Sequence, residues 1–394
     1  MIVVSVEGLA ASALGCYGSS WNETPAIDLL SSRGCVWDRA IAEHDDGLKV
    51  LANWLQPPPS HDPEHWIARW NDLGPVELIT DDSRLPQQSL DIDFDQTWLI
   101  DLDPPDADTP PAEEIEETHL AKLFAGLLTR IEDPNPAAVW WLHTQSLVRC
   151  WDAPRWLVPM DADELYADEP SEDVDLLPES DATIGEPDGE VPPWVFPDIL
   201  PPHLKLTEQS HPDLAVAWMR TYGCQVRLLD RMLALLLEYA ADLDPIVVLV
   251  GTSGFSLGQN QSIGYRAGPL RSCHHRVPMI VSDLGPMHEK RLFNAKSLPA
   301  LLAKIKTQPD RLIDPSVWVQ SESEFEPRII TQDDQGSTAV TTPRWYHVQD
   351  APQEFGTESN HLYLKPDDLD DQNDVSRLRY DIIELLGESP TLDH

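Results

Sequence analysis

Residues 1–9 read Met-Ile-Val-Val-Ser-Val-Glu-Gly-Leu. The run from Ile2 to Val6 is strand-length and almost wholly aliphatic, which predicts a strand buried on both faces, as in a parallel sheet. It is far shorter than the roughly 18 apolar residues that a bilayer span requires. Met1 leads directly into this strand, and the start of the chain lacks the basic region followed by a long apolar region that marks a signal peptide. We therefore expect a cytoplasmic protein without a signal peptide.

Strand-like and helix-like stretches alternate after this first strand. Such alternation predicts an α/β fold, with a mainly parallel sheet sandwiched by helices. The pattern fades after about residue 310, which divides the chain into a core over 1–310 and a smaller C-terminal α+β subdomain over 311–394 that packs on it. The predicted strands are 2–6, 76–80, 98–102, 138–142, 246–250, 277–282, 328–331, 338–341 and 344–348. The predicted helices are 24–34, with Thr24 as N-cap and Pro25 at the first position, 61–73, 115–131, 213–241 and 375–386.

Charge and cysteine content exclude several classes of protein. The 394 residues include 68 acidic and 27 Lys or Arg residues, a formal net charge of −41. A surface of this sign repels nucleic acid and anionic membranes as general partners. The five cysteines are odd in number and far apart, which is typical of reduced structural thiols and not of a disulfide framework.

The most acidic stretch is residues 161–190, within a predicted loop at about 161–200. It holds thirteen Asp or Glu residues and no Lys or Arg. Like charges repel one another, so we predict a solvated loop or a disordered segment. It lacks the Asp-x-Asp-x-Asp-Gly spacing of a calcium loop. A basic protein is the partner that such a segment would recruit.

Several short motifs, taken in order, resemble the sulfatases of the alkaline-phosphatase superfamily. Near the start these are Val4-Ser5-Val6-Glu7-Gly8-Leu9, Ala13-Leu14-Gly15-Cys16-Tyr17-Gly18, Thr24-Pro25-Ala26-Ile27-Asp28-Leu29-Leu30 and Trp37-Asp38-Arg39-Ala40. Further along they are Trp141-Leu142-His143, Trp151-Asp152-Ala153-Pro154, Gln225-Val226-Arg227-Leu228-Leu229-Asp230, Gly268-Pro269-Leu270, Arg276-Val277-Pro278-Met279-Ile280-Val281, Thr342-Pro343-Arg344-Trp345-Tyr346 and His361-Leu362-Tyr363. The resemblance implies the superfamily's α/β fold over nearly the whole chain.

The resemblance also implies a chemistry that this sequence departs from. Members bind a divalent metal with carboxylates after the first strand and with an Asp-His pair after a later strand. Glu7 stands in the place of the first carboxylate, and Gly8 where many members have a second Asp. After Ser253 the chain passes directly to Gly254 and Phe255, so the Asp-His pair is missing. We therefore expect no metal, with Glu7 as a remnant ligand.

The nucleophile of the family is absent as well. It derives from a Cys or Ser soon after the segment matched by 37–40, or is a Thr or Ser in phosphatase relatives, but residues 41–51 contain no Cys, Ser, Thr or Pro. Three interpretations remain open: Asp45 or Asp46 attacks as a carboxylate, residues 43–46 (Glu-His-Asp-Asp) form a new metal site, or the loop is a polar remnant.

Two further side chains are candidates for binding. The family's sulfate-gripping lysine falls near Tyr265 or Arg266, and Arg266 could hold an oxyanion bidentately. His143 follows the predicted strand 138–142, where it either faces a pocket or serves as a structural histidine. The consecutive residues Cys273, His274 and His275 cannot easily converge on one tetrahedral zinc ion.

We therefore interpret the chain as a sulfatase-like protein that is catalytically inactive and has a binding or regulatory role. The expected ligand is an anionic small molecule or a sulfated sugar. One alternative is a metal-dependent sulfuric or phosphoric ester hydrolase with a remodelled site, using one calcium or magnesium ion and remnants such as His143, Asp45 and Asp46. The other is a structural or interaction module.

Overall fold

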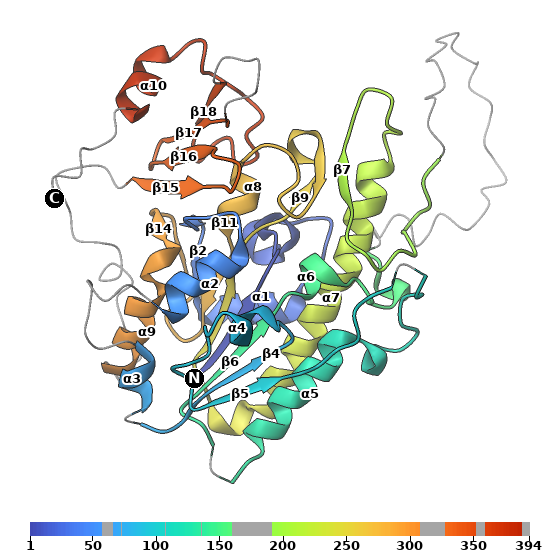
Figure 1. Ribbon diagram of the computed structural model, residues 1–394, viewed down its shortest axis with the longest axis vertical. Helices are drawn as coiled ribbons and strands as arrows, with labels where there is room; N and C mark the ends of the chain where they lie inside the picture. Colours follow the sequence, from blue (N-terminus) through green and yellow to red (C-terminus); the bar gives the residue numbers. More distant parts are fainter. Residues whose placement is uncertain are drawn as a thin grey trace.

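An eight-stranded sheet forms the centre of the structure and carries helices on both faces (Figure 1). The structure is a computed structural model that describes residues 1–56, 66–71, 73–106, 108–134, 136–159, 191–307, 328–351 and 359–387. The acidic segment 161–190 and the first residues of the predicted helix 61–73 lie outside the described residues, so the predictions made for them stay predictions.

The central sheet has the strand order β13-β2-β12-β8-β1-β6-β4-β5. Only β12 runs antiparallel to the rest, which confirms the predicted mainly parallel sheet. The first strand lies in the middle, between β8 and β6, as its buried composition indicates. In chain order the strands are β1 (Ile2–Val6), β2 (Cys35–Trp37), β4 (Val76–Thr80), β5 (Gln96–Leu99), β6 (Val139–Thr144), β8 (Val247–Gly251), β12 (Met279–Val281) and β13 (Met287–Glu289).

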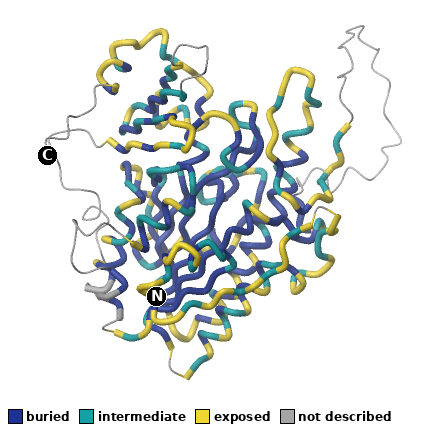
Figure 2. Tube along the Cα trace, viewed as in Figure 1, coloured by how far each residue is buried: buried dark blue, intermediate teal, exposed yellow. Residues whose placement is uncertain are grey.

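The two faces of this sheet are buried by different sets of helices. Successive strand side chains point to opposite faces, so Val4 belongs to one apolar cluster and Val3 to the other. The face of Val4 is covered by α1 (Pro25–Arg33), α5 (His119–Ile131) and α7 (Leu214–Tyr239). The face of Val3 is covered by α2 (Gly47–Leu55), α3 (Trp66–Asn71) and α9 (Leu298–Thr307). The buried strands between the helix layers are the dark blue centre of Figure 2.

Most predicted elements are present, and their ends shift where a distant residue intervenes. Helix α1 begins at Pro25 as predicted, but Thr24 makes no capping bond to it. The carboxylate of Asp230, on α7, accepts hydrogen bonds from the first helical N–H groups, those of Ala26 (3.2 Å) and Ile27 (2.9 Å). A capping group that far along the chain leaves no local signal in the sequence.

Two predicted elements are divided. Residues 115–131 form a short 3-10 helix and then α5, because Thr118 caps α5 by accepting a hydrogen bond from Ala121 N–H. Residues 277–282 contribute to two sheets, with Pro278 between β11 (Arg276–Val277) and β12. A small sheet orders β11-β3-β14, and another orders β7-β10-β9. Their strands are β3 (Ala40–Ile41), β7 (His203–Lys205), β9 (Ser256–Leu257), β10 (Ser262–Gly264) and β14 (Phe293–Asn294).

The C-terminal part is a four-stranded antiparallel sheet at the top of Figure 1. Its strands are β15 (Ile329–Gln332), β16 (Thr338–Thr341), β17 (Trp345–Gln349) and β18 (Asn360–Leu364), and α10 (Tyr380–Gly387) follows. The helix begins later than the predicted 375–386. Arg39 of the core donates to the carbonyls of Thr342 (2.8 Å) and Pro343 (2.7 Å), which fastens this sheet to the core. The proposed boundary near residue 310 falls among residues that are not described, so the domain division stays a prediction.

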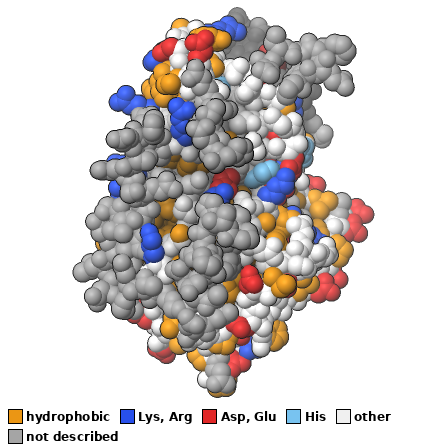
Figure 3. All heavy atoms as spheres, turned by 60° about the vertical axis from the view of Figure 1, so that its left-hand side comes forward, with side chains coloured by type: hydrophobic (Ala, Val, Ile, Leu, Met, Phe, Trp, Pro, Cys, Tyr) orange, Lys and Arg blue, Asp and Glu red, His pale blue; other side chains and the backbone are white. Residues whose placement is uncertain are grey.

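Short helices complete the described chain. They are α4 (Arg84–Gln87), α6 (Ser146–Arg149) and α8 (Ser272–His275), with 3-10 turns at Ala11–Ala13, Gly15–Tyr17, Ile115–Glu117, Arg155–Leu157, Ala241–Leu243, Gln259–Gln261 and Ala295–Ser297. None of the helices in the described ranges is long and apolar enough to cross a membrane. On the face drawn in Figure 3, acidic, basic and hydrophobic side chains are interspersed outside the grey residues.

Candidate functional site

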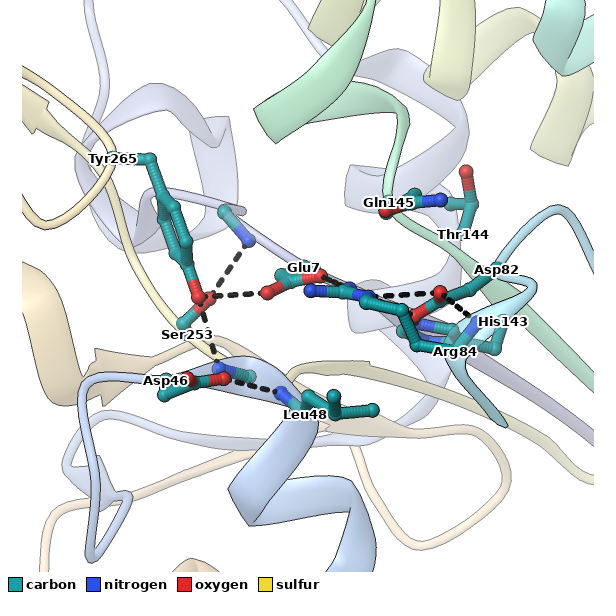
Figure 4. A network of polar contacts seen from close by, with 12 residues as sticks. Glu7, Asp46, Leu48, Asp82, Arg84, His143, Thr144, Gln145, Ser253 and Tyr265 are labelled. Atoms are coloured by element: carbon teal, nitrogen blue, oxygen red, sulfur yellow. Dashed lines mark hydrogen bonds and ion pairs between the residues drawn. The ribbon is translucent and has the colours of Figure 1, made fainter. Parts of the chain in front are cut away.

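Acidic, basic and imidazole side chains meet at the carboxyl ends of the central strands (Figure 4). Glu7 follows β1, Asp82 follows β4, and His143 lies on β6 between those strands. Because these strands are parallel, their carboxyl ends share one edge of the sheet, where α/β proteins commonly bind ligands. All three side chains are fully buried.

Both carboxylate oxygens of Glu7 are engaged. Arg84, the first residue of α4, places Nη2 2.5 Å from Oε2. The hydroxyl of Tyr265 donates to Oε1 at 2.7 Å. Burial, followed by the charge of Glu7, raises the pKa of Tyr265 well above its ordinary value, so the phenol keeps the proton that it donates. Glu7 is therefore held by one cation and one neutral donor.

The same guanidinium also binds Asp82. Arg84 Nε donates to Oδ1 at 2.8 Å and Nη2 to Oδ2 at 2.7 Å. Burial alone would raise the pKa of Asp82, but the adjacent His143 and the hydrogen bonds and charge of Arg84 outweigh it and hold the pKa well below its usual range. The Arg84 side chain is 35% exposed whereas both carboxylates are fully buried, so the guanidinium covers the two acids from the solvent side. We call Glu7, Asp82, Arg84 and His143 the buried cluster.

His143 completes the buried cluster from within β6, not from the loop after it as the sequence predicted. Its Nδ1 lies 3.0 Å from Ser5 Oγ, which also accepts a hydrogen bond from Trp141 Nε1 at 2.8 Å. Its Nε2 lies 3.7 Å from Asp82 Oδ2 and makes no hydrogen bond to any described residue. The ring is thus positioned by the neighbouring strand and turned toward Asp82.

The N-terminus of α2 closes the other side of Glu7. Asp46 caps this helix by accepting from Leu48 N–H at 2.9 Å, and Gly47 N–H donates to the Tyr265 hydroxyl at 3.0 Å. A Cβ atom on Gly47 would lie 2.7 Å from Glu7 Cγ and 2.5 Å from Thr252 Oγ1. The residue nearest Glu7 on this helix therefore has no room for a side chain.

Arg266 forms a second cluster nearby. Its Nε donates to Asp45 (2.9 Å), Nη1 to Asp46 (3.2 Å) and Nη2 to Asp334 (2.7 Å). Although burial acts to raise the pKa of Asp45, the adjacent His44 and the hydrogen bond from Arg266 lower it. We call Arg266 and these three aspartates the Arg266 cluster. All three nitrogens of this guanidinium, which could hold an oxyanion, already donate to carboxylates.

The buried cluster also has the composition of a metal site. Ligand atoms of Glu7, Asp82 and His143 all lie within 4.8 Å of one another. With Arg84 in place, however, one guanidinium binds both carboxylates and Tyr265 takes the second oxygen of Glu7. A divalent ion between the carboxylates would compete directly with this internal cation. The residues as arranged fit an arginine better than a metal.

The sequence singled out Glu7 and His143, and the structure brings them together. It also joins Asp45, Asp46 and Arg266, in the separate Arg266 cluster. Asp82 and Arg84 were missed, and the available signal was the acidic pair 81–82 directly after the predicted strand 76–80, beside the strand of His143. Arg84 itself leaves no pattern that distinguishes it from a surface arginine.

The consecutive histidines occupy structural positions. His274 Nδ1 accepts from Arg271 N–H at 3.1 Å, and His275 Nε2 lies 3.1 Å from Tyr346 Oη. Burial lowers the pKa of His274 to about 4 and that of His275 to about 3. Both rings are therefore neutral parts of the packing around α8 at ordinary pH.

No protein-family model and no curated protein match this chain, but solved structures match it over nearly its full length. A putative sulfatase from Bacteroides thetaiotaomicron is 13% identical, with a TM-score of 0.62 and coverage of 98% of this chain and 91% of that one. A protein solved with its substrate D-glucosamine-2-N,6-O-disulfate is 12% identical, with a TM-score of 0.63 and coverage of 98% and 96%.

The phosphonate monoester hydrolase of Agrobacterium radiobacter is 10% identical, with a TM-score of 0.61 and coverage of 98% and 93%. Identities this low establish the fold and not the activity. The chain has the fold of the sulfatase and alkaline-phosphatase superfamily, which confirms the resemblance drawn from its motifs.

Proposed function

We propose that this chain is a sulfatase-fold protein that does not hydrolyse esters at the edge of its sheet and acts instead by binding or regulation. The observation that carries the proposal is the guanidinium of Arg84, which ion-pairs with both Glu7 and Asp82. In the buried cluster a fixed organic cation takes the charge-neutralising role for which the fold family uses a metal. A guanidinium has no open coordination position, so it cannot supply Lewis-acid activation.

The arrangement also supports the absence of a nucleophile. Gly47, the helix residue nearest Glu7, has no side chain and no space for one. Asp45 and Asp46 each accept a hydrogen bond from Arg266, and Asp46 accepts another as the N-cap of α2. A carboxylate whose lone pairs are bound in this way is a poor nucleophile, because attack must first break those bonds.

One observation favours the alternative of a remodelled hydrolase. His143 Nε2 has no hydrogen bond among the described residues and lies 3.7 Å from Asp82 Oδ2, a carboxylate that would orient a histidine general base if the two came into hydrogen-bond contact. Its complete burial beneath Arg84 argues against contact with a substrate. The third reading, in which the acidic segment 161–190 recruits a basic partner, and an anionic ligand held by Arg266 both stay predictions.

A turnover assay and a metal assay test the proposal together. Aryl sulfate, phosphate and phosphonate esters, with calcium or magnesium added, should show no turnover above a protein-free control. Gly47→Cys co-expressed with a formylglycine-generating enzyme should gain none. Turnover that survives purification and is abolished by His143→Ala, or by changing Asp45 and Asp46 to Asn, would establish the remodelled hydrolase instead.

The metal assay examines the internal cation directly. The native protein should show no rise in melting temperature with calcium or magnesium, since Arg84 already holds the carboxylates. Arg84→Ala should gain such a rise, because ligand binding to the folded state stabilises it. The double variant Arg84→Ala/Glu7→Gln should lose it again. A rise of equal size in the native protein, abolished by Glu7→Gln, would contradict the proposal.

A further inference from the structure

A second group of ligand-type side chains lies outside the buried cluster. His119 is the first residue of α5, while Cys150 and Asp152 follow α6. One ligand atom from each, an imidazole nitrogen, the thiol sulfur and a carboxylate oxygen, all lie within 4.8 Å of one another. Three different metal-binding groups from two separate parts of the chain therefore converge on one point.

The surrounding contacts fix these residues in place. Asp152 Oδ2 accepts a hydrogen bond from the backbone N–H of His119 at 2.7 Å, which ties the start of α5 to the loop after α6. Between the two ligands in that loop, the fully buried Trp151 donates through Nε1 to Leu147 O at 2.7 Å. The Asp152 side chain and the backbone of His119 are thus tied together before any ligand arrives, which lowers the ordering entropy that opposes binding.

One atom of this group lacks a partner. Asp152 is 7% exposed, and its second oxygen, Oδ1, accepts no hydrogen bond from any described residue. A buried carboxylate oxygen without a donor costs free energy, and a bound cation is one of the few groups that removes the cost. The unpaired oxygen is independent evidence for a ligand at this point.

A small cavity adjoins His119 and Cys150. Its volume is about 20 Å³, and His119, Cys150, Gln145 and Ser146 line it. That is enough for about one water molecule. Asp81 and Asp103 add negative charge to its wall and Arg149 adds a positive charge. The cavity therefore leaves room for a water ligand beside His119 and Cys150.

We propose that His119, Cys150 and Asp152 bind a zinc ion, with water as its fourth ligand. A set of one nitrogen, one sulfur and one oxygen suits zinc, whereas calcium and magnesium take oxygen ligands and have little affinity for a thiolate. On binding, a zinc–sulfur bond forms and the thiol proton passes to solvent. The ion would join α5 to the loop after α6, at a point separate from the buried cluster.

The test uses the full-length protein, freed of metal with a chelator and titrated with cobalt(II) and with zinc. Cobalt should bind with one equivalent per chain and give the near-ultraviolet charge-transfer band of a cobalt–thiolate bond, and one equivalent of zinc should displace it. Cys150→Ser should remove the band and weaken zinc binding by at least about 100-fold. His119→Ala should weaken zinc binding to a similar extent, since even changes to residues outside the ligand set lower metal affinity about 10- to 100-fold.

The control is Cys16→Ser, which removes a different partly buried thiol and should leave the band and stoichiometry unchanged. Glu7→Gln should also leave them unchanged, which separates this site from the buried cluster. The native protein needs no variant to decide the question. If it is folded by circular dichroism and binds neither ion, or if the band persists in Cys150→Ser, the proposal is wrong.

Discussion

Two arginines of this protein bind carboxylates in nearly the same way but in different surroundings. Arg84 pairs with Glu7 and Asp82, which are both fully buried. Arg266 is 25% exposed and pairs with Asp45, Asp46 and Asp334, of which Asp334 is 41% exposed.

Water screens the outer pairs of the Arg266 cluster, so each contributes little to stability. In the buried cluster a carboxylate that loses its guanidinium has no water to replace it. The pair of Arg266 with the exposed Asp334 is therefore dispensable, whereas the pairs of Arg84 with the buried Glu7 and Asp82 are not. Because Arg84 closes the edge of the sheet where Glu7 lies, its loss should be costly for folding and informative for function.

The largest expected effect is that of Arg84→Met. It removes the charge but keeps an unbranched side chain, and leaves two buried carboxylates facing each other. We expect a loss of about 3 kcal/mol in the free energy of unfolding, the lower end for a broken buried pair because Arg84 is partly exposed. Urea unfolding measures it. The control Arg379→Met breaks an exposed pair with Asp381 and should cost much less, because solvent screens such a pair. Equal losses in the two variants would remove the distinction between the clusters.

The next effect is that of Tyr265→Phe. The change keeps the ring but removes the hydroxyl that donates to Glu7 and accepts from Gly47. One buried acceptor and one helix N–H then lack a partner, so we expect a loss of about 1–3 kcal/mol. Tyr239→Phe, at a 55% exposed position, is the matched control and should be nearly neutral. If Tyr265→Phe leaves the free energy of unfolding unchanged, water must reach the edge of the sheet at Glu7.

A third effect concerns acid. The pKa of Asp82 is lowered in the folded protein, because His143 and Arg84 outweigh the effect of burial. Its stabilising contribution is therefore complete above the unfolded pKa of about 3.9 and is lost as the pH falls below that value. Urea unfolding between pH 5 and 3 should show a steeper loss in the native protein than in Asp82→Asn. If the free energy of unfolding falls equally with pH in the two proteins, the partners of Asp82 do not stabilise its charged form.

The smallest effect belongs to the exposed end of the Arg266 cluster. Lys49 and Arg266 lower the pKa of Asp334 to about 2, yet the aspartate is largely exposed. Solvent screening leaves Asp334→Asn a cost of at most about 1 kcal/mol, fading at high salt because surface pairs are screened. Because folding lowers the pKa of Asp334, its contribution to the free energy of unfolding is lost as the pH falls from about 4 toward 2. Thermal melts at two salt concentrations measure it, and a cost that is large and independent of salt would place Asp334 with the buried pairs.

Local pattern was sufficient for β1, β4, β6 and β8 in the middle of the central sheet, but not for β2, β13, α2 or α9, which were not predicted. A run such as Ile2–Val6 has to be buried on both faces, and a parallel sheet between helices provides that burial, so composition alone predicts the place of β1. Glu7 and His143 were found through the resemblance to the sulfatase motifs, and for His143 also because it follows a predicted strand. Even so, the break at Thr118 and the start of α10 at Tyr380 depend on single hydrogen bonds and on packing, which periodicity does not report.

The partners of these residues were decided only by the tertiary structure. The sequence by itself determined that Glu7 keeps a charge where the fold family places a metal ligand, and that no hydroxyl or thiol follows at residues 41–51. It could not determine that Arg84, 77 positions away, supplies the counter-charge. An ion pair depends on distance and burial in three dimensions. The sequence therefore does not distinguish an arginine that pairs with a buried acid from one that faces water.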